Sequence, residues 1–380
     1  MKNFVAGKYI KQGAYKSFRP TALTRQWIID DMPIAALLSK ADRFLGRLDM
    51  YSEYVDIDLF IQMHIAKEAT QSAKIEGTQT KMEETFLSQS EISAEKRDDW
   101  EEVRNYTAAM NEAVNMLQAL PFSTRLIRQA HKILLRGVRG QHKQPGEFRK
   151  SQNWIGGATL GNAVFVPPVH TEVPDLMSDI EYFAHAQDDN IPDLIKIALI
   201  HYQFETIHPF LDGNGRTGRL IITLYLVSKG ILKRPILYLS DFFERHRALY
   251  YDNLMRVRTH NDIAQWLKFF LTGIVEVAQN GVATLEKIMQ LKQSIEVQAD
   301  KLGKRGAAAR VLLNYLYKKP VISVAEAAGL IGKTPQTAYN LIGGLEKAGV
   351  LKEITGAQRN KLYLFEPYVR LFDAAAGADT

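Results

Sequence analysis

A twelve-residue stretch with the sequence HPFLDGNGRTGR gathers side chains that suit chemistry on a polyphosphate. It runs from His208 to Arg219 and contains one imidazole, one carboxylate, one amide, two guanidinium groups and three glycines. Glycines let backbone N–H groups approach oxyanions closely, and a helix that begins at Asn214 or Gly215 would point its positive end at the same anion. The stretch therefore predicts a phosphate-binding site with a titratable base beside it.

The charged side chains of this stretch suit three different tasks. Asp212 offers the hard oxygen ligand that Mg²⁺ takes in proteins, usually together with phosphate oxygens. Arg216 and Arg219 are three residues apart, so they lie on the same side of the expected helix and can both bind phosphate oxygens. His208 can accept a proton near neutral pH. The combination predicts a reaction at a nucleotide phosphate with a general base.

Other interpretations of the glycines explain less. Residues 213–218 match the GxGxxG pattern of dinucleotide-binding folds, but that pattern follows a strand, whereas a helix and His-Pro-Phe precede it here. The pattern GxxxxGK[ST] of nucleotide-binding loops is absent from the sequence. A plain glycine turn with solvated arginines does not account for so many specified residue types in one short stretch.

Length and composition limit the class of protein. The 380 residues suffice for two or three domains, at roughly 100 to 200 residues each. There is no cysteine, which excludes disulfides, thiolate catalysis and cysteine-ligated metals. The longest apolar run, residues 220–227, is far shorter than the ~20 residues of a membrane span, and the first residues lack the apolar core of a signal peptide. We therefore expect a cytoplasmic protein without membrane contact.

The elements that position the stretch are predicted to be mainly helices. Apolar residues recur at helical spacing in residues 57–74 and 103–117, with a polar loop at 77–94 between them. Further helices are expected at 124–135, 194–205, 220–227, 245–257 and 263–277. Residues 144–170 differ, because Trp154-Ile155 and residues 164–166 are β-favouring runs on either side of glycines. They predict a hairpin with a glycine-rich tip.

A second unit is expected after a charged helical connector at 281–304. Helices are predicted at 307–317, 324–328 and 335–348, with Ser323 and Thr334 as caps, a turn at 329–333, and short strands at 350–354 and 361–365. This order resembles a winged helix-turn-helix domain at 305–366, followed by a tail at 367–380.

The charge of this second unit indicates a partner. It contains nine basic and four acidic residues, so it carries five of the six net positive charges of the chain. The outward-facing residues of the recognition helix would be Lys333, Thr334, Gln336, Thr337 and Asn340. DNA contact through this helix is therefore a prediction, although many such domains bind only proteins.

Residues 208–219 match the Fic family signature H-x-F-x-[D/E]-G-N-G-R-x-x-R at every position, and the chain resembles bacterial Fic proteins of the autoinhibited type. The resemblance implies transfer of AMP from ATP to a Ser, Thr or Tyr hydroxyl of a target protein. It implies that His208 is the general base, that Asp212 holds Mg²⁺ and that Arg219 binds the γ-phosphate. The other residues implied to bind the nucleotide phosphates are Gly213, Asn214, Gly215 and Gly218, while Arg216 is implied either to assist in binding the same anion or to brace the loop. Family members that act as kinases carry lysine in place of the acid, so nucleotidyl transfer is expected.

A second motif, Ser72-Ala-Lys-Ile-Glu76-Gly77, matches the inhibitory pattern [ST]-x-x-x-E-[GN] of the same family. The resemblance implies that Glu76 pairs with Arg219 and occupies the guanidinium that the γ-phosphate needs. Two alternatives remain open. The motif can be a serine on a helix flank, a surface glutamate and a glycine that ends the helix, or Glu76 can orient a water molecule that removes AMP.

The resemblance also assigns target docking and adenosine binding. The hairpin at 153–168 corresponds to a flap that docks an extended target segment by strand addition, through Asn153, Trp154, Ile155, Gly156 and Gly157. Tyr250 and Tyr251 match aromatic positions beside the adenosine, although aromatic residues on a helix are commonly core, and Arg258 stands where an asparagine is frequent. The remaining histidines considered, which lack metal-ligand spacing, are expected to be structural or on the surface: His131, His201 and His246.

These observations predict a mainly α protein. A helical region with the inhibitory motif is expected at 1–120 and a helical Fic core with a β-hairpin flap at 121–280, followed by the connector, the winged-helix domain and the tail. ATP and Mg²⁺ are the expected cofactors, and a homodimer is compatible with the sequence. The alternative function is a nucleotide-sensing, DNA-binding regulator without turnover. Turnover that depends on His208 would separate the two, because a sensor has no use for a general base.

Overall fold

The computed structural model describes residues 4–23, 30–54, 57–137, 140, 142–187, 190–300 and 303–373, and most of them lie in helices. The mainly helical class is thereby confirmed. The helices are α1 (Met32–Tyr54), α2 (Ile57–Ile75), α3 (Arg97–Met116), α4 (Thr124–Leu134), α5 (Val173–His185), α6 (Asp193–Ile207), α7 (Asn214–Ser228), α8 (Ser240–Arg245), α9 (Arg247–His260), α10 (Ile263–Asp300), α11 (Gly306–Lys318), α12 (Val324–Ile331), α13 (Pro335–Lys347) and α14 (Glu366–Asp373). The strands are β1 (Gly7–Gln12), β2 (Tyr15–Pro20), β3 (Val321–Ser323), β4 (Lys352–Glu353) and β5 (Leu362–Leu364).

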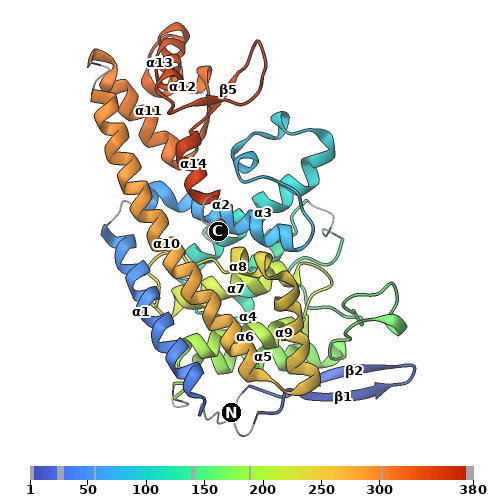
Figure 1. The fold of residues 1–380 in the computed structure, drawn as a ribbon. Helices are drawn as coiled ribbons and strands as arrows, with labels where there is room; N and C mark the ends of the chain where they lie inside the picture. Colours follow the sequence, from blue (N-terminus) through green and yellow to red (C-terminus); the bar gives the residue numbers. More distant parts are fainter. Residues whose placement is uncertain are drawn as a thin grey trace.

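Helices α6 and α7 form the centre of the main body (Figure 1). Every residue of α6 from Leu194 to Ile207 is buried, as is expected for a helix that is apolar on all sides. This helix packs against α5, α7 and α10, while α7 packs against α3 and α4. The loop between α6 and α7 carries residues 208–213, so the motif lies between the two most buried helices.

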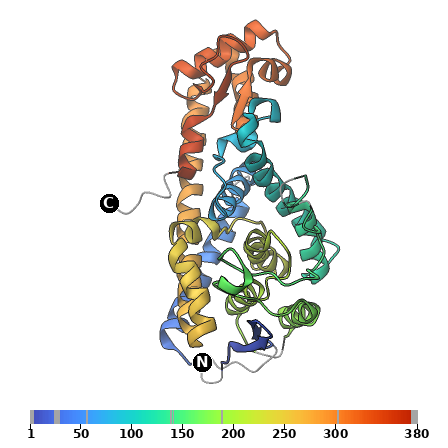
Figure 2. The ribbon, with the colours of Figure 1, turned by 90° about the vertical axis from the view of Figure 1, so that its right-hand side faces the viewer.

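Helix α10 is continuous over 38 residues, and α1 packs along it. At 1.5 Å per residue it is roughly 57 Å long, and it links the main body to the C-terminal unit at the opposite end from the N-terminal hairpin (Figure 2). The predicted division into a helix at 263–277 and a separate connector is therefore wrong. Gly281 lies inside the helix and does not end it. A Cβ at this position would lie 2.9 Å from Leu48 of α1, so the missing side chain permits close packing of the two helices.

An antiparallel hairpin of β1 and β2 at the N-terminus was not predicted. It pairs Gly7 with Pro20 and turns at Gly13, whose φ is +60°. Phe18 is buried against Phe165, and its N–H donates to the carbonyl oxygen of Val166 at 2.9 Å. The hairpin thus supports the segment that was expected to form the flap.

The C-terminal unit combines α11, α12 and α13 with a three-stranded antiparallel sheet in the order β3-β5-β4. Ser323 and Thr334 cap α12 and α13 through their side chains, as predicted. Helix α12 extends to Ile331, so the turn begins at Gly332 rather than at 329. Residues 367–373 of the predicted tail belong to α14, which packs against α2 and α10. Residues 374–380 lie outside the described residues.

Candidate active site

The active-site loop, residues 208–213, joins two left-handed backbone positions. His208 ends α6 with φ 49° and ψ 61°, and Gly213 precedes α7 with φ 72°. Helix α7 begins at Asn214, one of the two starts considered, and six residues before the helix predicted at 220–227. The Asn214 amide closes the loop, because Oδ1 accepts from the Phe210 N–H at 2.8 Å and Nδ2 donates to the Phe210 carbonyl at 2.9 Å. This side chain was expected on phosphates, but here it braces the loop, which leaves the backbone N–H groups at the start of α7 as donors for an anion.

Two side chains from residues 149–153 hold the same loop from outside. Arg149 is buried, and its guanidinium donates to the carbonyl oxygens of His208 at 3.0 Å and Pro168 at 2.5 Å. The Asn153 amide donates to the carbonyl oxygens of His208 at 3.1 Å and Phe210 at 2.9 Å. Asn153 was predicted to dock a target, yet its side chain supports the loop.

His131 of α4 braces the loop from a third direction. Its ring stacks on Phe210 with 3.7 Å between centroids, and Nδ1 accepts from the Gly146 N–H at 2.8 Å. Nε2 is therefore the protonated nitrogen, and it donates to the Asp212 carbonyl at 2.9 Å. Burial lowers the pKa of His131 to about 4. The structural role expected for this histidine is thus exerted directly on the loop.

His208 faces a cavity of about 520 Å³ at the start of α7. Burial, with smaller effects of Arg258 and Arg149, lowers its pKa to about 3, so the imidazole is neutral at physiological pH. Nδ1 has no hydrogen-bond partner in the described part of the chain. The cavity is lined by the end of α2 and the loop after it, by Asp99 and Glu102 of α3, and by the motif residues His208, Asp212, Gly213, Asn214, Gly215 and Arg216.

Glu76 and Arg219 form the ion pair that the second motif implied. Arg219 Nη2 donates to Glu76 Oε1 at 2.6 Å, and Nε donates to Ser72 Oγ at 2.9 Å. The Arg219 side chain is 1% exposed and that of Glu76 is 37% exposed, so the glutamate lies between the guanidinium and solvent. Burial favours a raised pKa of Glu76, but Arg219 outweighs it and holds the pKa below its usual value. Gly77, with φ 102°, follows the end of α2.

Arg216 and Asp212 lie on the other side of the cavity. Arg216 was expected on phosphate, but its Nη1 donates to Glu102 Oε2 at 3.0 Å, and both side chains are buried. Arg216 Nη2 lies 3.8 Å from Asp212 Oδ1. Asp212 is 41% exposed at the cavity, and one such carboxylate fits Mg²⁺ that arrives with a nucleotide. No cluster of three or more metal-ligating side chains is found among the described residues.

Two glycines of α7 leave space for carboxylates. A Cβ at Gly215 would overlap Glu76 Oε1, and one at Gly218 would overlap Oε1 of Glu205 on α6. Glu205 is buried, and burial together with Glu76 raises its pKa to about 7 against the opposing effect of Arg219. A second acidic group, Glu205, therefore lies beside the Glu76–Arg219 ion pair.

Tyr250, which was expected beside the adenosine, is buried in the structure. Its hydroxyl lies 2.9 Å from His201 Nε2 and its ring stacks on Phe243, so it belongs to the buried aromatic core. Tyr251 is exposed next to it, with 5.2 Å between the ring centroids. Arg258 packs over the Phe165 ring at 3.9 Å and donates to Thr206 Oγ1. Neither tyrosine lines the cavity at His208.

The expected flap forms only part of a hairpin. A single bridge pairs Ile155 with Phe165, and the chain between them contains a 3-10 turn at Leu160–Asn162. Gly156 and Gly157 have φ of 66° and 75°, which takes the backbone out of the strand conformation directly after Ile155. Trp154 is partly exposed beside this turn.

Several residues at the site were not found from the sequence. Glu102, Arg149 and Glu205 lie outside both motifs, and nothing in their local sequence distinguishes them from surface or core residues. These residues can be assigned to the site only from the structure, because each contacts a motif residue that is distant in the sequence or lies on a neighbouring helix.

Two regions of the chain match models of known protein families. Residues 121–226 match the Fic/DOC family and residues 35–115 match the family described as Fic/DOC family N-terminal. Two solved structures share the fold of this chain. A Fic family protein from Desulfovibrio desulfuricans G20 has a TM-score of 0.57 at 19% identity and covers 90% of this chain and 98% of its own. A Fic domain containing signaling protein from Bacteroides thetaiotaomicron has a TM-score of 0.51 at 20% identity, covering 67% and 97%. Residues 35–115 and 121–226 therefore belong to the Fic/DOC family.

Curated relatives include the protein adenylyltransferase Fic of Drosophila grimshawi, 28% identical over 169 residues, which is 42% of this chain and 32% of the relative. The protein of the same name from Culex quinquefasciatus is 34% identical over 125 residues, or 33% and 22%. The chain thus spans less than a third of the length of these relatives. No helix in the described residues is long and apolar enough to cross a membrane.

Proposed function

We propose that this protein transfers AMP from ATP to a Ser, Thr or Tyr hydroxyl of a target protein. The observation that carries the proposal is the shared cavity, in which a neutral His208 and an exposed Asp212 face the first turn of α7. The names of the curated relatives support the same activity. In this reaction most of the catalysis is positioning and charge stabilisation.

The residues have separate tasks in this reaction. The target hydroxyl oxygen forms a bond to the α-phosphorus, the bond from that phosphorus to the oxygen bridging to the β-phosphorus breaks, and pyrophosphate leaves. The hydroxyl proton passes to the His208 imidazole. The backbone N–H groups at the start of α7 bind phosphate oxygens, and Arg219 binds the γ-phosphate. Asp212 would hold Mg²⁺, which when bound supplies positive charge that offsets the phosphates.

Glu76 inhibits this transfer in our proposal. Arg219 is buried beneath Glu76, so the guanidinium has no room for a γ-phosphate while the ion pair is closed. ATP would then bind only in a pose that does not react. The exposed position of Glu76 also suits a second task, in which its carboxylate orients a water molecule for removal of AMP from a modified target.

The test is transfer of label from ATP carrying ³²P at the α-phosphate, with Mg²⁺, and with the protein itself and a cell lysate as acceptors. The variants are the parent, Glu76→Gly, and Glu76→Gly combined with His208→Ala. We expect label with Glu76→Gly and none with the double variant. Glu95→Gly, an exposed glutamate in the loop before α3, is the control and should behave like the parent. No label in any variant, despite ATP binding, would reject the transferase and favour the sensor.

We further propose that residues 153–168 dock the target segment. Ile155 N–H donates to the Phe165 carbonyl at 2.8 Å, so Ile155→Pro removes one of the three backbone hydrogen bonds that join Ile155 to residues 164 and 165. Modification of a target should fall while ATP binding is retained. Ala158→Pro, in the exposed part of the same segment, is the control. Equal loss of target modification and ATP binding would reject the docking role.

The C-terminal unit supports a proposal of DNA contact through a winged helix-turn-helix domain. The helices α12 and α13 stand beside a small antiparallel sheet, and Lys333, Gln336, Thr337 and Asn340 are exposed. Salt-sensitive gel shifts at low ionic strength should weaken in Lys333→Ala. Lys287→Ala, an exposed lysine on α10, controls for the lost charge. The absence of salt-sensitive binding by the parent would reject DNA as the partner.

A further inference from the structure

The face of α2 that reaches the active site continues to the C-terminal unit. Phe60, His64, Glu68 and Ser72 of α2, with Glu76 just after it, follow one another at intervals of four residues. This spacing keeps successive side chains on neighbouring positions of one helix face. Ser72 and Glu76 contact Arg219 at one end of this row, which we call the α2 row.

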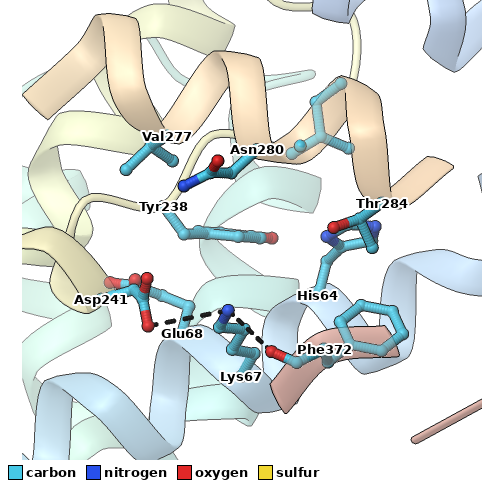
Figure 3. A pocket seen from close by; sticks show the side chains of 11 residues that line it. His64, Lys67, Glu68, Tyr238, Asp241, Val277, Asn280, Thr284 and Phe372 are labelled. Atoms are coloured by element: carbon cyan, nitrogen blue, oxygen red, sulfur yellow. Dashed lines mark hydrogen bonds and ion pairs between the residues drawn. The ribbon is translucent and has the colours of Figure 1, made fainter. Parts of the chain in front are cut away.

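The other end of the α2 row contacts the C-terminal unit. The Phe60 ring packs edge-on against Tyr317 of α11, with 5.2 Å between centroids, and is tilted against Tyr368 of α14. The His64 ring packs edge-on against Phe372 of α14 at 5.0 Å. One turn away, Lys67 Nζ donates to the Phe372 carbonyl at 2.9 Å (Figure 3). The contacts of α14 with α2 therefore include both aromatic rings and a charged hydrogen bond.

The middle of the α2 row is fixed to the main body through one carboxyl group. Glu68 Oε1 accepts from Tyr106 Oη of α3 at 2.8 Å and from Ser240 Oγ of α8 at 2.5 Å. This buried group lies between the α14 contacts and Ser72. Helix α2 also packs against α3 and α8, and Lys67 Nζ lies 3.6 Å from Asp241 Oδ1 of α8. Movement of α2 at the end near α14 would therefore act on the ion pair through a helix that is anchored along its middle.

The contact with α14 is not tightly packed. A cavity of about 50 Å³ lies between α2, α8, α10 and Phe372 (Figure 3). The buried polar atoms His64 Nε2 and Tyr238 Oη, which line it, have no hydrogen-bond partner in the described ranges. Such a polar space is large enough for a few water molecules, at about 10 to 15 Å³ each. A joint of this kind can rearrange at lower cost than a close-packed core.

We infer that α14 is a releasable latch that holds α2 in the inhibiting position, so that the C-terminal unit controls the Glu76–Arg219 pair. The inference deepens the proposed function and rests on it. Release of Phe372 and Tyr368 frees the first half of α2, and Glu76 then withdraws from Arg219 more often. A partner that binds the C-terminal unit and displaces α14 would thereby activate transfer.

The test uses full-length protein with Phe372→Ala, which removes the ring against His64. Self-labelling should rise by about fivefold or more over the parent, the usual lower range of coupling between sites. Phe372→Ala should add nothing in the Glu76→Gly background, because the latch acts only through Glu76. Phe372→Leu keeps the apolar bulk and should stay near the parent. Arg370→Ala, on the exposed side of α14, is the matched control.

A second measurement does not depend on activity. Hydrogen exchange of the amides at 68–76 should be faster in Phe372→Ala than in the parent and unchanged in Arg370→Ala. Unchanged exchange in this segment, or an equal rise of labelling in the Glu76→Gly background, would overturn the latch. If Glu76→Gly itself shows no labelling, the proposed transferase fails, while the exchange measurement still decides whether α14 holds α2.

Discussion

Arg149 and His208 are joined beneath the active-site loop, where the guanidinium Nε donates to the His208 carbonyl oxygen at 3.0 Å. Another nitrogen of the same guanidinium donates to the Ile207 carbonyl at 3.3 Å. His208 has φ 49°, a backbone conformation that a non-glycine residue holds only when its surroundings stabilise it. Arg149 therefore positions the imidazole without contacting the cavity.

Arg149→Lys should lower transfer while leaving ATP affinity nearly unchanged. Lysine keeps the charge but cannot reach several carbonyl oxygens in the planar geometry of a guanidinium. A misplacement of the base by about 1 Å costs up to ~100-fold in rate, so we expect at least a tenfold loss in the Glu76→Gly background. Single-turnover labelling and ATP titration measure the two quantities. Arg128→Lys, which alters a neighbouring hydrogen bond to Gly146, is the control. Parallel losses of rate and affinity would contradict a positioning role.

The pH dependence of transfer should lack the usual histidine midpoint. Burial and the nearby arginines hold the pKa of His208 at about 3, so the base form is lost only as the pH falls through that value. A histidine with the ordinary pKa of about 6.5 would lose roughly tenfold in rate at pH 5.5. We expect the rate of Glu76→Gly at saturating Mg²⁺ and ATP to stay within twofold between pH 7.5 and 5.5. A midpoint near pH 6.5 would show that His208 is hydrated in the reacting complex.

The sequence was informative where the chemistry is local. The loop at 208–213 and the start of α7 follow from adjacent residues, so their conformation was predictable. Glu76 and Arg219 are 143 positions apart, and only the resemblance to a family connected them. The burial of Tyr250 against His201 could not be predicted, because an aromatic residue on a helix has the same sequence pattern whether it faces a ligand or the core. Helix α10 was divided wrongly because packing of Gly281 against Leu48 overrides a local helix breaker.

Glu68 should make stability depend on pH in a defined direction. Burial raises the pKa of this carboxyl group to about 7, above its unfolded value near 4.5, although hydrogen bonds from Ser240 and Tyr106 oppose the shift. Its contribution to stability is therefore complete below pH 4.5 and is lost as the pH rises through 7. Relative to the parent, Glu68→Gln should gain about 2 to 3 kcal/mol of unfolding free energy between pH 5 and 8. Urea denaturation at both values measures this, and a difference that is independent of pH would refute it.

The two arginines of the motif should respond differently when their acidic partners are neutralised. Glu102 and Arg216 are 9% and 6% exposed, so Glu102→Gln leaves a buried positive charge and should cost about 3 kcal/mol or more. Glu76→Gln should cost at least 2 kcal/mol less, because Glu76 is 37% exposed and its loss admits water to Arg219.

Glu205 strengthens this contrast between the two pairs. Glu76 is one of the groups that raise the pKa of Glu205, so its neutralisation favours ionisation of Glu205 beside Arg219. An inhibitory contact requires that Glu76 can leave Arg219 at low cost, and Glu205 lowers this cost because its carboxylate can ionise beside Arg219. The Glu102–Arg216 pair, in contrast, maintains the fold. Urea midpoints of the two glutamine variants compare them directly. Equal losses would mean that Glu76 is a structural partner of Arg219, and the proposal of inhibition would then lose its physical basis.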